Sequence, residues 1–260
     1  VHHNGKFFPD LMCHKALDFT QKASKPFLIY YAMNLPHYPY QAPEKWIDHY
    51  KDMQMPRKLY AAAVSAIDES IAELFDGLKK QGKFDNTIIV FMSDHGHSTE
   101  VRAFGGGGSA GPFRGAKFSL YEGGLRVPGI IYYPPVVPGN ITRDQTCSSL
   151  DWLPTLLDIC QIKHDPSAFT GKTILPVLTD NEPSPHKHLI WKSGKQKAIR
   201  RGDWKLLENA IDTTKGANNY AKVHHGLALY NLKSDPGETT DVSKKHPKIV
   251  EQLKNFLPSR

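Results

Sequence analysis

Apolar and polar positions alternate along this chain with two different periods. Residues 27–33, Phe-Leu-Ile-Tyr-Tyr-Ala-Met, form a continuous apolar run, which is typical of a strand buried on both faces. Residues 86–92 and 127–133 are two further predicted strands. From residue 57 to 80, apolar side chains recur every three or four positions, which predicts an amphipathic helix. The order of strand, helix and strand predicts a parallel crossover unit and therefore an α/β fold.

The pattern changes after about residue 185. Short pieces in which apolar and polar residues alternate predict antiparallel strands at 197–200, 204–207 and 227–232. A last amphipathic stretch, 246–257, predicts a helix. We therefore predict an α/β domain over residues 1–184 and a small α+β subdomain over residues 185–260.

Composition narrows the class of protein. The chain has 260 residues, of which 40% are hydrophobic and 23% charged, as in ordinary globular proteins. No stretch approaches the roughly 18 consecutive apolar residues of a membrane helix, so we expect no membrane span. The first residues, Val-His-His-Asn, contain neither an initiator Met nor an apolar signal region, so we expect the sequence to begin partway into a longer chain.

Net charge and cysteine content restrict the possible partners and disulfides only weakly. The net charge of +7 suits a polyanionic partner, but an ordinary solvated basic surface is the alternative. Because no aromatic-basic binding module is present, we expect no nucleic-acid partner. Three cysteines without a CxxC pair are too few for a disulfide framework, so we expect buried free thiols, with one bridge still possible.

Polar groups follow two of the predicted strands. His37 stands in a loop between two prolines, and Asp94 and His95 follow the second strand, with Gly96 behind them. Ligands of open parallel sheets bind beyond the carboxyl ends of the strands. A carboxylate beside an imidazole can ligate a metal there. The alternatives are a helix cap with a solvated histidine for the pair, and a packed loop histidine for His37.

A third group of candidate residues follows the glycine-rich segment 104–115. Lys117 could supply a compact cation to a tetrahedral oxyanion, although a solvated lysine is the alternative. Two glycines stand between Glu122 and Arg126, and they permit a tight turn that an ion pair between these two side chains could fix.

In their order along the chain, these motifs resemble those of the sulfatase family, which belongs to the alkaline phosphatase superfamily. The matching stretches include Pro36-His-Tyr-Pro39, Ser93-Asp-His-Gly96, Lys117 through Pro128 with its Glu122-Gly-Gly turn, Asp151-Trp-Leu-Pro-Thr-Leu-Leu157, Arg201-Gly-Asp-Trp-Lys-Leu206 and Asp235-Pro-Gly-Glu238. The resemblance implies an alkaline-phosphatase-like mixed, largely parallel sheet flanked by helices, with a small C-terminal antiparallel sheet plus helix. Residues 1–184 would then be the C-terminal part of the sulfatase catalytic domain.

The resemblance also implies roles for individual residues. Asp94 and His95 would be two ligands of a divalent metal, usually Ca²⁺ in this family. Imidazole suits zinc and similar metals better than calcium, so another divalent metal is the alternative. His37 would contact the bridging oxygen and help to protonate the leaving alcohol, and Lys117 would bind a sulfate oxygen. These roles are electrostatic.

The family's nucleophile is a formylglycine, made from Cys or Ser in a Cys/Ser-x-Pro/Ala-x-Arg motif, and these 260 residues contain no such motif. We therefore expect the formylglycine, and the missing N-terminal part of the same domain, to lie upstream, and this chain alone to be inactive. The substrate would be a sulfated small molecule, such as an aryl or sugar sulfate, or a sulfated polysaccharide. The family is extracytoplasmic, that is periplasmic, secreted or lysosomal. The alternatives are a metal-dependent phosphodiesterase or phosphatase of the same superfamily, and a non-catalytic sulfated-glycan-binding remnant.

Overall fold

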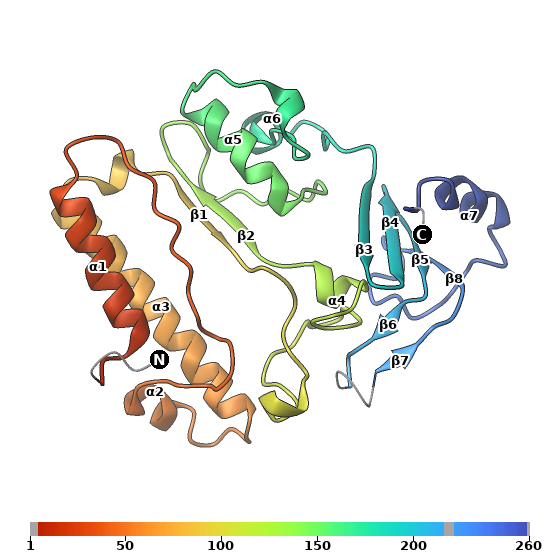
Figure 1. Ribbon diagram of the computed structural model, residues 1–260, viewed down its shortest axis with the longest axis horizontal. Helices are drawn as coiled ribbons and strands as arrows, with labels where there is room; N and C mark the ends of the chain where they lie inside the picture. Colours follow the sequence, from red (N-terminus) through yellow and green to blue (C-terminus); the bar gives the residue numbers. More distant parts are fainter. Residues whose placement is uncertain (1–4, 216–220, 259–260) are drawn as a thin grey trace. The chain divides into compact units, whose positions relative to one another are not determined.

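The computed structural model describes residues 5–215 and 221–258, which divide into two compact units. The first unit comprises Val1–Thr87 and His97–Ser109, and the second comprises Ile88–Gly96 and Ala110–Arg260. Figure 1 labels the helices and strands of each unit. None of the helices in the described ranges is both long and apolar enough to cross a bilayer.

The first unit is helical. Its elements are α1 Phe8–Lys22, α2 Glu44–His49, α3 Arg57–Lys80 and the short 3-10 turns η1 Phe84–Asn86 and η2 Val101–Ala103. The predicted helix over 57–80 is confirmed as α3, whose apolar stripe buries Ala63 and Ile67 against Leu35. Helix α1 packs against α3 (Figure 1), and Gly77 of α3 makes room for the Leu17 side chain.

The segment 27–33 forms no strand, so the strand predicted there is wrong. Its side chains alternate between half-buried and exposed positions, with Leu28 84% and Tyr30 92% exposed. Within residues 5–215 and 221–258 no strand pairs with it, and the parallel crossover predicted from it is not among the strand pairings. An extended segment becomes a strand only when a neighbour accepts and donates its backbone hydrogen bonds, and the sequence pattern does not supply that neighbour.

The second unit begins with an antiparallel pair of strands, β1 Ile89–Met92 and β2 Gly129–Tyr132, in the register Ile89↔Tyr132. Its helices are α4 Glu122–Leu125, η3 Ser149–Asp151, α5 Trp152–Ile159, η4 Pro166–Ala168, α6 Leu175–Asp180 and α7 Pro247–Lys254. The remaining strands are β3 Leu189–Ser193, β4 Gln196–Arg201, β5 Trp204–Glu208, β6 Ile211–Asp212, β7 Lys222–Val223 and β8 Leu227–Asn231.

A four-stranded antiparallel sheet, in the order β3-β4-β5-β8, organises the second unit (Figure 1). Because successive side chains of a strand point to opposite faces, each strand contributes to two cores. One face buries Ile199, Leu206 and Leu229 against Leu253 of α7. The opposite face buries Ala198, Leu207, Ala228 and Tyr230 against Leu120 and Tyr121. The sheet therefore lies between a helix and the loop that leads into α4.

These elements confirm the predicted fold class in its α/β character and in its small C-terminal antiparallel sheet plus helix. The largely parallel sheet that the resemblance implied is not found among residues 5–215 and 221–258, where every strand pairing is antiparallel. The four-stranded sheet begins at Leu189, whereas the compact units divide at other positions; the subdomain boundary at residue 185 stays a prediction. The three cysteines are free, but only Cys13 is buried. The expectation of buried thiols is wrong for Cys147 and Cys160, which are exposed.

Candidate functional site

Asp94 and His95 directly follow strand β1. The Asp94 Oδ1 atom accepts a hydrogen bond from the His95 backbone N at 2.9 Å. The Asp94 Oδ2 atom lies 3.2 Å from His95 Nε2. Both side chains reach solvent within their unit, with 81% of Asp94 and 41% of His95 exposed. The two side chains therefore converge on a point that a bound group can reach.

The hydrogen-bonding capacity of this pair fits a cation. His95 Nδ1 lies 2.8 Å from the carbonyl oxygen of Gly96, which can only accept, so Nδ1 carries the proton. In the neutral imidazole, Nε2 then holds a lone pair that faces the Asp94 carboxylate. Two acceptors this close repel each other unless a positive charge lies between them. Asp94 and His95 thus suit a shared divalent cation or proton.

The pair supplies only part of a metal shell. Within the described residues, no group of three or more His, Cys, Asp and Glu side chains is arranged to hold a metal ion. Structural and catalytic metals in proteins take about four or more ligands, of which water or substrate can be one. The remaining ligands must therefore come from groups other than Asp94 and His95.

Gly96 joins this segment to the turn at α4. Its backbone N donates to the carbonyl oxygen of Gly124 at 3.0 Å. A Cβ atom on Gly96 would lie 1.9 Å from the Gly123 oxygen, which is closer than any side chain can approach. Gly123 in turn packs against the carbonyl oxygens of Arg114 and Gly115. The absence of side chains lets the backbone behind Asp94-His95 lie against the backbone of the loop that carries Lys117.

Lys117 lies in the middle of an irregular loop, residues 114–122, which we call the Lys117 loop. Its side chain is half-buried, and its Nζ lies 5.1 Å from the centroid of the Phe118 ring. Phe118 has a φ of 73°, an uncommon left-handed backbone conformation for a residue with a side chain. The predicted ion pair at the end of this loop is confirmed, since Arg126 Nε donates to Glu122 Oε2 at 3.1 Å.

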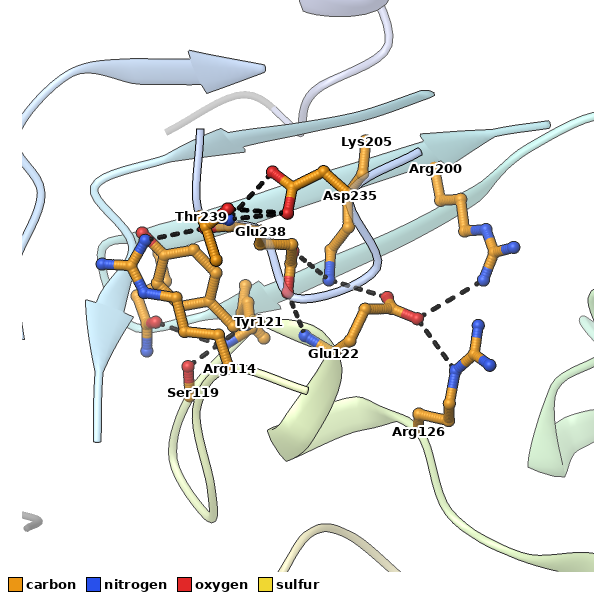
Figure 2. Close-up of polar contacts among 12 residues, drawn as sticks. Arg114, Ser119, Tyr121, Glu122, Arg126, Arg200, Lys205, Asp235, Glu238 and Thr239 are labelled. Atoms are coloured by element: carbon orange, nitrogen blue, oxygen red, sulfur yellow. Dashed lines mark hydrogen bonds and ion pairs between the residues drawn. The ribbon is translucent and has the colours of Figure 1, made fainter. Parts of the chain in front are cut away.

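Glu122 belongs to a larger buried network that sequence reasoning missed. Figure 2 shows the Lys205 ammonium between two carboxylates, 2.8 Å from Glu122 and 3.0 Å from Glu238. Glu238 Oε2 also accepts the Glu122 backbone N–H at 2.6 Å, and Arg200 lies 3.5 Å from Glu122. Lys205 and Glu238 are fully buried. The available signals were a lysine beside two leucines in strand β5 and the place of Lys205, Glu122 and Glu238 within the family-like stretches.

The network shifts the pKa values of Glu122 and Glu238 in opposite directions. Burial acts to raise the pKa of Glu122, but Lys205, Arg200 and Arg126 outweigh it and hold that pKa below its ordinary value. For Glu238, burial dominates and raises the pKa, although Lys205 opposes the shift. Glu122 therefore releases its proton more readily than Glu238.

His37 lies in the first unit. Its Nδ1 is 2.6 Å from the Tyr38 carbonyl oxygen, and its ring stacks on the Tyr38 ring with centroids 4.2 Å apart. The Nδ1–H group donates to that carbonyl, which leaves Nε2 for another partner. The Tyr38 hydroxyl donates to Glu100 Oε2 at 2.9 Å, and Ser98 and Arg102 also contact the Glu100 carboxylate. Glu100, a buried carboxylate that sequence reasoning did not select, thus positions the ring beneath His37.

The structure therefore brings the Asp94-His95 segment and the Lys117 loop together within the second unit, through Gly96 and Gly124. His37 belongs to the first unit. The prediction that His37, Asp94, His95 and Lys117 face one cleft stays a prediction.

Comparisons with known proteins point to one family. The family model described as Sulfatase matches residues 3–162. A second model, described as N-sulphoglucosamine sulphohydrolase, C-terminal, matches residues 113–259. Together the two models account for nearly the whole chain, and they overlap across the Lys117 loop.

Individual relatives agree with this. Arylsulfatase J of Mus musculus is 28% identical over 273 residues, which cover 90% of this chain and 45% of that protein. Human (Homo sapiens) N-acetylgalactosamine-6-sulfatase is 28% identical over 260 residues, which cover 92% of this chain and 49% of that protein. The chain spans about half the length of the curated relatives it matches.

Two solved structures resemble the fold. The structure of Ps i-CgsB in complex with k-i-k-neocarrahexaose matches with a TM-score of 0.81 and 29% identity, over 96% of this chain and 54% of that chain. The structure of BT4656 in complex with D-glucosamine-2-N,6-O-disulfate matches with a TM-score of 0.54 and 27% identity, over 76% of this chain and 39% of that chain. Both structures contain a bound carbohydrate.

Proposed function

The chain belongs to the sulfatase family, and from this premise we propose that the protein hydrolyses sulfate esters of a carbohydrate or an aryl alcohol. The observation that carries the proposal is the convergence of Asp94 and His95 next to the Lys117 loop. With a divalent cation bound to the acceptor pair, the cation and Lys117 would together form a positively charged setting for a sulfate group. Preorganised positive charge of this kind stabilises anionic transition states.

Asp94 and His95 would hold the divalent cation, and Ca²⁺ is the ion that family membership favours. The imidazole of His95 makes a zinc-like ion the alternative. The bound cation would supply positive charge beside the sulfate, and the formylglycine used by the family would supply the nucleophile.

Lys117 would bind a sulfate oxygen through its ammonium, which is a compact and flexible cation. His37 would contact the bridging oxygen of the scissile bond. Its Nδ1–H is committed to the Tyr38 carbonyl, so the proton for the leaving alcohol would come from Nε2 of the protonated ring. The Glu100–Tyr38 hydrogen bond would keep that ring in place.

We propose a sulfated carbohydrate as the substrate in preference to an aryl sulfate. Two lines of support exist: the similar structures Ps i-CgsB and BT4656 contain carbohydrate ligands, and the chain carries a net charge of +7. A basic protein attracts a sulfated glycan at low ionic strength. An extracytoplasmic location agrees with such a substrate.

We also propose that further parts of the catalytic domain lie outside these 260 residues. The relatives are about twice as long, and each unit exposes apolar side chains, such as Leu28 and Tyr30 in the first and Ile130 in the second. Large exposed apolar side chains in a strand-like segment are typical of a sheet face or edge that another segment covers.

The test is sulfate release by the full-length protein. We expect it to release sulfate from a sulfated oligosaccharide and from nitrophenyl sulfate, and to lose this activity on treatment with a chelator. Residues 1–260 alone should release none. Preferential hydrolysis of nitrophenyl phosphate or of a phosphodiester would instead show a phosphoryl-transfer enzyme, and tight glycan binding without turnover would show a non-catalytic binder.

A further inference from the structure

We propose that the strands and loops after residue 189 position Lys117 for catalysis, and that Thr213, Thr214 and Gln196 are the positioning residues. This inference rests on the proposed function, because it concerns how Lys117 meets the sulfate. We call residues 189–215 and 221–241 the C-terminal sheet region. Its side chains hold the backbone on both sides of Lys117.

The two residues before Lys117 are held by neighbouring threonines. The backbone N of Gly115 donates to Thr214 Oγ1 at 2.8 Å, and the backbone N of Ala116 donates to Thr213 Oγ1 at 3.0 Å. Thr213 is buried, with 1% of its surface exposed, whereas Thr214 is exposed. The hydroxyl groups thus replace the partners that a helix or a strand would give these amides.

The residues after Lys117 are held by the amide side chain of Gln196 and by the Ser119 hydroxyl, which donates to the carbonyl oxygen of Ile211 at 2.6 Å. Gln196 Nε2 donates to the carbonyl oxygen of Phe118 at 2.8 Å. Gln196 Oε1 accepts from the backbone N of Ile211 at 2.9 Å and lies 3.4 Å from the backbone N of Leu120. Gln196 is buried, so both ends of its amide are committed to fixed backbone groups. It links the loop to the segment that carries the two threonines.

The ends of the loop are anchored by charge. Arg114 donates to Asp212 Oδ2 at 2.7 Å and to the carbonyl oxygen of Glu238 at 3.0 Å. At the other end, Glu122 is fixed by Lys205 and Glu238, as Figure 2 shows. The C-terminal sheet region therefore contacts the loop at both ends and on both sides of its lysine.

Such a loop needs external support. Gly115 and Phe118 both have left-handed backbone conformations, with φ of 84° and 73°. A non-glycine residue keeps such a conformation only where its surroundings determine it. Without the hydrogen bonds to Thr213 and Gln196 the backbone would relax, and the origin of the Lys117 side chain would shift. A displacement of about 1 Å in a group that contacts substrate can cost up to about a hundred-fold in rate.

A double-mutant cycle with Lys117 in the full-length protein tests this inference. Thr213→Val removes the hydroxyl at nearly constant volume. Thr214→Val does so at an exposed position, and it also removes the hydrogen bond that Thr214 Oγ1 donates to Asp212 Oδ1 at 2.6 Å. We expect each valine variant to lower kcat/KM on a sugar sulfate by roughly ten-fold, mainly by raising KM. Thr213→Ser keeps the hydroxyl and should restore the activity. In a Lys117→Ala background, the valine variants should change kcat/KM by less than about two-fold, because the group they position is gone.

Thr155 provides the matched control. It is also buried, and its Oγ1 accepts a backbone N–H, that of Ile174, at 2.9 Å in another part of the second unit. Thr155→Val should cost stability like Thr213→Val but leave kcat/KM unchanged. The inference is overturned if Thr213→Val and Thr214→Val lower kcat/KM by the same factor with and without Lys117. It is also overturned if these variants lower kcat/KM no more than Thr155→Val does.

Binding of inorganic sulfate, measured by calorimetry, separates this inference from the proposed function. If the wild type binds sulfate through Lys117 but hydrolyses no sulfate ester, the proposed function fails. The inference then stands if Thr213→Val and Thr214→Val weaken sulfate binding only when Lys117 is present. It fails if they leave sulfate binding unchanged, or if Lys117→Ala has no effect on it.

Discussion

The Lys205 ammonium lies 2.8 Å from the Glu122 carboxylate, and neither side chain has more than 5% of its surface exposed. The pair joins strand β5 to the turn at α4, so it connects two segments more than eighty residues apart in the sequence. Buried ion pairs contribute little net stability compared with apolar packing, but loss of one partner leaves an uncompensated buried charge. This asymmetry makes the pair easy to test.

We expect Lys205→Met to destabilise the protein by about 3–5 kcal/mol, since Glu122 and Glu238 would lose the cation between them. Lys197→Met is the matched control, because Lys197 in the adjacent strand pairs with the partly exposed Glu208 at 3.0 Å. The control should cost about 1 kcal/mol or less. Urea unfolding of the full-length variants measures both. Similar losses in the two variants would contradict the special role of the buried lysine.

Acid should destabilise the second unit through Asp212. Burial acts to raise the pKa of this carboxyl, but hydrogen bonds from Thr214 and Arg114 outweigh it and lower the pKa below its ordinary value of 3.8. A carboxyl whose pKa is lower in the folded state stabilises the fold above the unfolded value, and this contribution disappears as the pH falls through the folded value.

Asp212→Asn should therefore be less stable than the wild type at neutral pH, and the difference should shrink below about pH 4. Urea midpoints of the two proteins across this pH range provide the measurement. A constant difference at every pH would show that the Asp212 charge does not contribute.

Gly96→Ala should be destabilising, because the new methyl group would lie 1.9 Å from the Gly123 carbonyl oxygen. Forcing such a group into a close backbone contact costs about 1–3 kcal/mol. Gly139→Ala is the control, since nothing lies within 4 Å of a Cβ at that position. Thermal unfolding compares the two variants. If Gly96→Ala is as stable as Gly139→Ala, the backbone contact between the Asp94-His95 segment and α4 is incorrect.

The metal preference of the full-length protein should depend on His95. Imidazole favours zinc over calcium, whereas a side-chain amide oxygen suits calcium. We expect His95→Asn to weaken Zn²⁺ binding by roughly ten-fold or more, which is the usual loss of affinity when a residue beside a bound metal is replaced. The affinity for Ca²⁺ should change less. Calorimetric titration with each metal decides the matter. Unchanged affinity for both ions would exclude His95 as a ligand.

His37→Ala should reduce kcat more for a sugar sulfate than for nitrophenyl sulfate. Nitrophenolate leaves without a proton, whereas a sugar alkoxide needs one, so the difference between the two losses should be roughly ten-fold or more. Steady-state kinetics of the full-length enzyme on both substrates measure it. Equal losses would show that His37 packs or positions and does not act as the acid.

Local patterns determined much of the fold. The apolar period of α3 and the alternation of β4, β5 and β8 predicted these elements, because a helix stripe and a strand face are each set by residues close in the sequence. The same reasoning failed at residues 27–33. An apolar run shows that a segment avoids water, but a strand also needs a neighbour for its backbone hydrogen bonds.

The residues of the candidate site also fall into those that the sequence indicates and those that only the structure reveals. The sequence alone selected Asp94, His95, His37 and Lys117 as candidates, from their residue types, their places after predicted strands or the glycine-rich segment, and the resemblance to sulfatases. It could not select Lys205, Glu238 or Gln196, whose roles depend on partners 76 to 116 residues away. A buried charge or amide acquires its function from the groups that folding places within hydrogen-bonding distance, and only the tertiary structure determines which groups those are.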